Sequence, residues 1–166
     1  MAAEQVIERL IMEYGDTILR MCYLYLNDYH LAEDAAQETF IKAMKHYDSF
    51  NWKSSEKTWL TRIAINSCKN MMRINWFRLG RGHLKEDVQA FGTDPIENVL
   101  ERESMTKAIQ SLEVHDRELI ILYYYQELSM KEIAQVIGKS ENTTIQRMNR
   151  ARKRLKKILM EVGYGA

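Results

Sequence analysis

The chain has 166 residues, of which 46% are hydrophobic and 28% are charged, and its net charge is +1. This composition is typical of a soluble globular protein with one or two small domains, and it excludes an intrinsically disordered chain. A single proline and seven glycines leave long helices few interruptions. No run reaches the roughly 18 apolar residues that a membrane span needs.

The N-terminus and the two cysteines indicate a cytoplasmic protein. The first residues, MAAEQVIERLIMEYGD, are acidic and amphipathic, unlike a secretion signal. Cys22 and Cys68 lie far apart and outside any metal-ligand spacing, so we expect buried, reduced thiols.

The small net charge conceals a segregation of charge along the chain. Residues 1–48 contain four Lys/Arg and nine Asp/Glu, a net charge of −5, whereas residues 49–85 contain eight basic residues and one acidic residue, a net charge of +7. Residues 147–157 add seven basic residues and no acidic one. The pattern indicates an acidic surface for a protein partner and two basic surfaces for a polyanion, with chance variation as the alternative.

Residues 1–78 have helical periodicity nearly throughout and predict an N-terminal helical domain. A first helix has an apolar face at Val6, Leu10, Ile18, Met21 and Leu24/Tyr25. A second, LAEDAAQETFIKAMKHY, has an apolar stripe at Ala36, Phe40, Ala43/Met44 and Tyr47. SFNWKSSE is expected to be a loop. A third helix, about 57–76, has a predicted buried face of Leu60, Ile63, Ala64, Ser67, Met71 and Ile74.

A glycine-containing segment without a period, residues 79–93, is expected to be a linker to a second domain, residues 94–166. Asp94-Pro95 is typical of a helix start, which we expect to continue toward Leu112. The segment DRELIILYYYQE then predicts a short, largely buried helix.

The last stretch, SMKEIAQVIGKSENTTIQRMNRARKRL, predicts a helix-turn-helix. Ser129 and Glu132 form a capping box, Gly138 suits a turn with positive φ, and Ser140 caps a second helix. The first helix has a narrow apolar face at Ile133, Ala134 and Ile137. The second has an apolar stripe at Thr144, Met148, Ala151, Leu155, Ile158/Leu159 and Val162. Its opposite side carries Thr143, Gln146, Arg147, Arg150, Lys153, Arg154 and Lys157.

Catalytic chemistry finds little support in the sequence. The four histidines, His30, His46, His83 and His115, are scattered, and no phosphate loop, nucleophile elbow or HExxH occurs. The polar residues Glu33, Asp34, Gln37 and Glu38 lack a further ligand for a metal, so a ridge that faces a protein is the better interpretation. We therefore predict no enzyme, no metal site and no cofactor.

Binding of nucleic acid is better supported. Asn142, Gln146, Arg147 and Arg150 suit base edges in a major groove, whereas Lys153, Arg154 and Lys157 suit phosphates; a solvated basic face is the alternative. In the loop and third helix, Phe50, Trp52 and Trp59 alternate with Lys53, Lys57 and Arg62. Such a mixture suits stacking on single-stranded nucleic acid, but the periodicity equally allows aromatic residues that only pack in a core.

Three stretches in this order and spacing resemble the extracytoplasmic-function (ECF) group of bacterial sigma factors. AEDAAQETFIKA is similar to the helix that docks on core RNA polymerase, and KTWLTRIAINSCKNMMR to the helix that faces the −10 promoter element. The third stretch, similar to the domain that reads the −35 element, is LEVHDRELIILYYYQELSMKEIAQVIGKSENTTIQRMNRARKRL. The resemblance implies an all-α fold of two small helical domains joined by a flexible linker, the C-terminal one a helix-turn-helix.

The resemblance also implies a role for particular residues. Contacts with core polymerase would come from Glu33, Asp34, Gln37 and Glu38. Contacts with the −10 element would come from Asn51, Trp52, Lys53, Ser54, Trp59, Arg62, Asn66, Lys69 and Arg73. Contacts with the −35 element would come from Lys131, Glu141, Asn142, Thr143, Gln146, Arg147, Arg150 and Lys153.

The implied function is promoter recognition and promoter opening, with core RNA polymerase, promoter DNA and an anti-sigma factor as partners and without membrane insertion. The chain departs from the family pattern at Glu56, where an apolar or aromatic residue is usual, at Asn70, where Asp is usual, and at Thr144, where Val is usual. Two alternatives are a stand-alone helix-turn-helix regulator and a helical adaptor that does not contact DNA.

Overall fold

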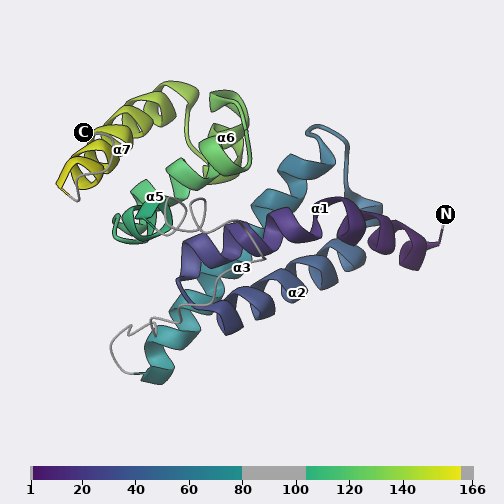
Figure 1. Cartoon of the computed structure of the whole chain (residues 1–166). Coiled ribbons are helices and arrows are strands. Elements are labelled where there is room, and N and C mark those ends of the chain that lie inside the picture. Colours follow the sequence, from purple (N-terminus) through teal and green to yellow (C-terminus); the bar gives the residue numbers. More distant parts are fainter. Residues whose placement is uncertain (1, 80–103, 162–166) are drawn as a thin grey trace. The chain divides into compact units, whose positions relative to one another are not determined.

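The computed structural model describes residues 2–79 and 104–161, and in these two ranges helices are the only regular secondary structure. The chain divides into two compact units, Met1–Asp87 and Val88–Ala166 (Figure 1). The prediction of an all-α protein with two helical domains is therefore confirmed. Most of the predicted linker, and the predicted helix start at Asp94-Pro95, lie outside the described residues, so the domain limits stay predictions.

Unit 1 consists of α1 (Ala3–Leu26), α2 (Tyr29–His46), the 3-10 turn η1 (Tyr47–Ser49) and α3 (Glu56–Leu79). A two-residue turn joins α1 to α2, which lie side by side (Figure 1). Asn27 adopts the left-handed conformation, with φ of 55°, which asparagine tolerates better than most residues. Asp28 then accepts a hydrogen bond of 3.0 Å from the Leu31 backbone N–H and caps α2.

The predicted apolar stripes form most of the core of unit 1. The buried side chains from the predicted faces are Val6, Leu10, Ile18, Met21, Leu24, Tyr25, Ala36, Phe40, Ala43, Leu60, Ala64 and Ser67. Both cysteines are buried and free, as predicted. The prediction was wrong for Met44 and Ile74, which are 40% and 44% exposed. For Ile74 the reason is that the C-terminal end of α3 runs past α1 and α2 (Figure 1).

Unit 2 consists of the helical residues 104–110, α5 (Val114–Ile120), the π-helical turn η2 (Ile121–Tyr125), α6 (Met130–Ile137) and α7 (Glu141–Glu161). The helix predicted in DRELIILYYYQE is thus α-helical only to Ile120 and continues as a π-helical turn from Ile121 to Tyr125. Its buried residues meet those of α6 and α7 in one core, formed by Leu119, Ile120, Ile121, Leu122, Ile133, Ala134, Met148, Ala151 and Leu155. Ile158 and Leu159 are only partly buried, and Val162 lies outside the described residues.

The helix-turn-helix forms through the predicted caps. The Glu132 backbone N–H donates to Ser129 Oγ at 3.1 Å, and the Ser129 backbone N–H donates to Glu132 Oε1 at 3.0 Å. Gly138 ends α6 with φ of 70°. The Thr143 backbone N–H then donates to Ser140 Oγ at 3.1 Å and starts α7. The two helices are therefore held by satisfied backbone groups on both sides of the glycine turn.

Gly138→Ala is expected to destabilise unit 2 by about 1–2 kcal/mol, because a left-handed conformation strains any residue that has a Cβ atom. Nothing lies within 4 Å of the added Cβ, so backbone strain is the whole effect. Amide hydrogen exchange of α6 and α7 in the full chain measures it, and Gly138→Asn is the matched variant with a smaller expected loss. Equal protection in all three proteins would contradict the prediction.

Candidate nucleic-acid and protein interfaces

The outward face of α7 carries the residues expected to meet duplex DNA. Thr144, Met148, Ala151 and Leu155 are buried and fix the rotation of the helix about its axis. Six of the residues predicted to contact the −35 element are exposed: Lys131 on α6, and Glu141, Asn142, Gln146, Arg150 and Lys153 on α7. Thr143 and Arg147 are half-buried. Polar and basic groups therefore follow one exposed side of the first turns of α7, directly after the glycine turn.

Thr144 shows how this chain accommodates a polar residue on the buried side of α7. Its side chain is fully buried, and its hydroxyl donates to the Ser140 backbone carbonyl at 2.8 Å. Because the hydroxyl is satisfied within the helix, the departure from valine leaves no unpaired polar group in the core.

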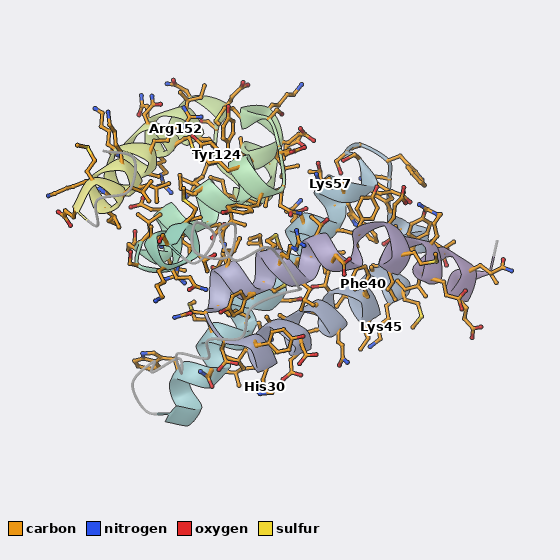
Figure 2. The ribbon with its side chains drawn as sticks, viewed as in Figure 1. His30, Phe40, Lys45, Lys57, Tyr124 and Arg152 are labelled. Carbon is orange, nitrogen blue, oxygen red and sulfur yellow. The ribbon has the colours of Figure 1, made fainter. Side chains whose placement is uncertain are left out.

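Two arginines of α7 have partners that the sequence did not predict. Arg154, expected to meet phosphate, donates at 2.7 Å to Asp116 of α5, whose side chain is only 8% exposed. This hydrogen bond raises the pKa of Arg154. Arg152 lies over the Tyr123 ring at 4.6 Å and near the Tyr124 ring (Figure 2). Arg154 thus joins α7 to α5, and its expected contact with phosphate stays a prediction.

Four aromatic side chains gather around the loop between η1 and α3, and we call Tyr47, Phe50, Trp52 and Trp59 the aromatic cluster. Phe50 stacks on Trp59 with ring centroids 4.8 Å apart. The Phe50 and Trp52 rings are tilted by 36°, with centroids 4.5 Å apart. Phe50 is buried and Trp59 half-buried, whereas Trp52 is 63% exposed. The two interpretations left open by the sequence therefore apply to different residues: Phe50 and Trp59 pack, and Trp52 presents its ring to solvent.

The backbone of this loop, residues 50–55, is specifically shaped. Trp52 adopts φ of 60°, a conformation that costs a bulky residue about 1–3 kcal/mol. Asn51 Oδ1 accepts a hydrogen bond of 3.0 Å from the Lys53 backbone N–H. Ser55 caps α3, because its Oγ accepts a hydrogen bond of 3.1 Å from the Thr58 backbone N–H. Strain of this kind persists where the surrounding contacts hold the residue, as the rings of the aromatic cluster do here.

An ion pair beneath the loop was not predicted. Arg9 of α1 donates two hydrogen bonds to Glu56, at 3.0 Å to Oε1 and 2.6 Å to Oε2. The Tyr47 hydroxyl donates to the same Oε2 at 2.7 Å. Hydrogen bonding from Arg9 lowers the pKa of Glu56, and hydrogen bonding to Glu56 raises the pKa of Tyr47. We call these three residues the Arg9–Glu56–Tyr47 network.

The network should make unit 1 sensitive to acid. The folded-state pKa of Glu56 lies below its ordinary value of 4.5, so its stabilising effect is complete above that value and disappears as pH falls through the folded-state pKa. The difference in free energy of unfolding between wild type and Glu56→Gln should be constant at neutral pH and shrink below about pH 4.5. Urea unfolding followed by tryptophan fluorescence measures it, because all three tryptophans lie in unit 1. A difference that does not change with pH would contradict this.

The face of α3 that continues from the loop is polar and basic. Arg62, Asn66, Lys69 and Arg73 are all exposed, as their helical spacing predicted. Arg73 donates a hydrogen bond of 2.8 Å to Asn70 Oδ1, so Asn70 orients a basic side chain on this face. The structure thus places the exposed Trp52 and a row of polar and basic groups in one unit, along consecutive segments of chain.

The acidic ridge of α2 is exposed over most of its residues. Glu33, Asp34 and Gln37 are exposed, whereas Glu38 is partly covered and pairs with Lys42 at 2.9 Å. Among the described residues, no group of three or more His, Cys, Asp or Glu side chains is arranged to hold a metal ion. Across residues 2–79 and 104–161, no helix has the length and apolarity to cross a membrane.

Comparisons with known proteins agree with both units. Residues 10–78 match the Sigma-70 region 2 family, and residues 102–155 match Sigma-70, region 4. The chain is 31% identical to the ECF RNA polymerase sigma factor SigW of Bacillus subtilis over 90% of this chain and 86% of that protein. It is 34% identical to the RNA polymerase sigma factor YlaC of the same organism, over 91% of this chain and 90% of that protein.

Solved structures show the same fold. The sigma factor RpoE of Bartonella quintana, crystallised with the anti-sigma factor NepR, has a TM-score of 0.77 and 26% identity, over 92% of this chain and 96% of that one. CnrH, solved with the cytosolic domain of CnrY, has a TM-score of 0.72 and 22% identity, over 95% of this chain and 90% of that one. Sigma factors are regulatory proteins that bind core RNA polymerase and promoter DNA. These matches argue against the two alternatives, a stand-alone helix-turn-helix regulator and a helical adaptor. The chain belongs to the ECF family of RNA polymerase sigma factors, which direct the polymerase to specific promoters.

Proposed function

We propose that the two basic surfaces of this sigma factor contact the two elements of a promoter, the loop and α3 at −10 and α7 at −35. The observation that carries the proposal is the exposure of Trp52 on a strained loop next to the basic face of α3. An exposed aromatic ring beside cations suits a base taken out of the duplex and the phosphates that flank it. The predicted −10 residues Asn51, Lys53 and Ser54 belong to the same loop.

At the −35 element, the first turns of α7 would lie in the major groove. Arginine pairs with guanine edges and asparagine or glutamine with adenine, so Asn142, Gln146, Arg147 and Arg150 are the base-reading candidates. Lys131 on α6 and Lys153 further along α7 would meet phosphates on either side. Glu141 and Thr143, in the first turn, complete the predicted contact set.

The acidic ridge of α2 is proposed to bind core polymerase. Its exposed carboxylates have no role in the core of unit 1, and exposed charge at an interface steers association with a basic partner. We further propose that an anti-sigma factor controls the chain, as NepR forms a complex with the 26% identical RpoE of Bartonella quintana. In this account the protein acts in the cytoplasm and carries no catalytic activity of its own.

Site-specific photo-crosslinking in the holoenzyme tests these assignments. A crosslinking amino acid at Asn51 should label the non-template strand at −10, and one at Asn142 should label the −35 duplex. A crosslinker at Glu4, exposed at the start of α1, is the control and should label neither. Labelling of the −35 duplex from Asn51, or of no DNA from either position, would contradict the assignments.

A further inference from the structure

The Arg9–Glu56–Tyr47 network joins three separate elements at the base of the aromatic loop. Arg9 comes from α1, Tyr47 begins η1, and Glu56 begins α3. Arg9 uses both terminal nitrogens on both carboxylate oxygens, the geometry that fixes an ion pair in direction as well as distance. The Glu56 side chain is only 14% exposed.

The network closes the loop at both ends. Tyr47 begins η1, the turn that leads into the loop, and Glu56 immediately follows the loop, so their 2.7 Å hydrogen bond joins the two ends of this segment. The Phe50 backbone N–H also donates to the Tyr47 carbonyl at 3.0 Å. Arg9 then fixes this closure to α1, outside the loop. The carboxylate of Glu56 is therefore the one group in this arrangement that both Arg9 and the Tyr47 hydroxyl contact.

Through Tyr47 the network reaches every member of the aromatic cluster. The Tyr47 ring lies 6.2 Å from Phe50, 6.0 Å from Trp52 and 5.9 Å from Trp59, with edge-on geometry to both tryptophans. Such contacts depend on ring orientation. Because the hydroxyl is held by Glu56, the position of the Tyr47 ring is fixed, and with it the surface against which the Trp52 ring packs.

A purely stabilising role explains this arrangement less well. A partly buried ion pair is weak support for stability, because an apolar pair of the same size often stabilises as much; its distinct contribution is to fix one geometry. Here the fixed geometry belongs to the strained, exposed Trp52. We propose that Arg9 and Glu56 are positioning residues for promoter opening: they contact no DNA, and through Tyr47 they hold Trp52 in the conformation that receives an unpaired −10 base.

This inference rests on the proposed −10 role of the loop, and the test separates the two. Promoter DNA is first selected from a random library by the holoenzyme, and its −10 segment is opened by mismatches. The measured quantity is the ratio of holoenzyme affinities for this probe with and without each −10 base of the non-template strand. The ratio reports base contact, and loss of folded protein does not change it.

For the wild-type holoenzyme the ratio should be about 5-fold or more at one base, as expected for base–aromatic stacking. Glu56→Gln, Arg9→Gln and Tyr47→Phe, which keep the size of each side chain, should each bring it below about 2-fold. The Arg9→Gln/Glu56→Gln double variant should be no worse than either single variant, because all three residues act as one unit.

Glu13→Gln is the matched control, because Glu13 also pairs with Arg9, at 2.9 Å, but lies outside the network. It makes the same charge change and should leave the ratio at the wild-type value. A wild-type ratio of 1 at every base would overturn the −10 role of the loop and the positioning role with it. A wild-type ratio that Glu56→Gln and Tyr47→Phe leave unchanged would overturn the positioning role alone.

Discussion

Arg147→Ala should cost the holoenzyme about 1–3 kcal/mol at the −35 element, a roughly 5- to 150-fold loss of affinity, if its guanidinium pairs with a base edge. Arg147 lies in the second turn of α7, half-buried at the edge of the buried stripe that contains Met148 and Ala151. The measurement is the affinity of the holoenzyme for promoters with the selected −35 sequence and with each of its base pairs replaced. For the holoenzyme with Arg147→Ala, replacing one of these base pairs should no longer change the affinity.

Lys157→Ala is the matched control for this experiment. Lys157 is exposed on the same helix but far from its N-terminus, where a side chain meets phosphates and not bases. It should weaken binding to every sequence alike and reduce the salt dependence by about one counterion. An Arg147→Ala variant with unchanged base preference, or a Lys157→Ala variant with altered base preference, would show that α7 lies differently on the DNA.

Asp34→Lys should weaken assembly with core polymerase by at least about tenfold, because placing like charges together at an interface costs several kcal/mol. Asp34 is exposed in the middle of the acidic ridge, so the substitution changes the surface charge without disturbing the core of unit 1. Titration of labelled polymerase with the variant at low and high salt measures the effect. The loss should be smaller at high salt.

Glu4→Lys makes the same charge reversal in the first turn of α1, away from the ridge. It should leave the affinity for polymerase near the wild-type value. Equal losses in both variants would mean that the total charge of unit 1 steers assembly and that α2 holds no specific site.

Residues whose structure depends on near neighbours in sequence were predicted well. The capping box at Ser129, the positive φ of Gly138 and the cap from Ser140 are local events, settled within a few residues. The buried faces of α1 and α7 follow from one period of 3.6 residues. The exposed faces of α3 and α7, and with them the candidate DNA contacts, follow from the same period because each lies opposite a buried stripe.

Contacts between distant residues could not be predicted. Arg9 and Glu56 are 47 positions apart, and Asp116 and Arg154 are 38 apart. Seen alone, Glu56 was a departure from an apolar position, and Arg154 was one of many basic residues. Trp52 gave no sign of its left-handed backbone, because tryptophan rarely adopts it. For each of these residues, the conformation or role depends on side chains that are distant in sequence and come close only in the folded protein.

Promoter-dependent transcription with core RNA polymerase tests the central claim most directly. Purified chain and core enzyme are mixed with templates that carry promoters selected from a random library, and RNA from the promoter start is measured. The account predicts a stable complex with the core and transcripts that disappear when either the −10 or the −35 element is scrambled. Failure to bind the core, or transcripts indifferent to both elements, would contradict it.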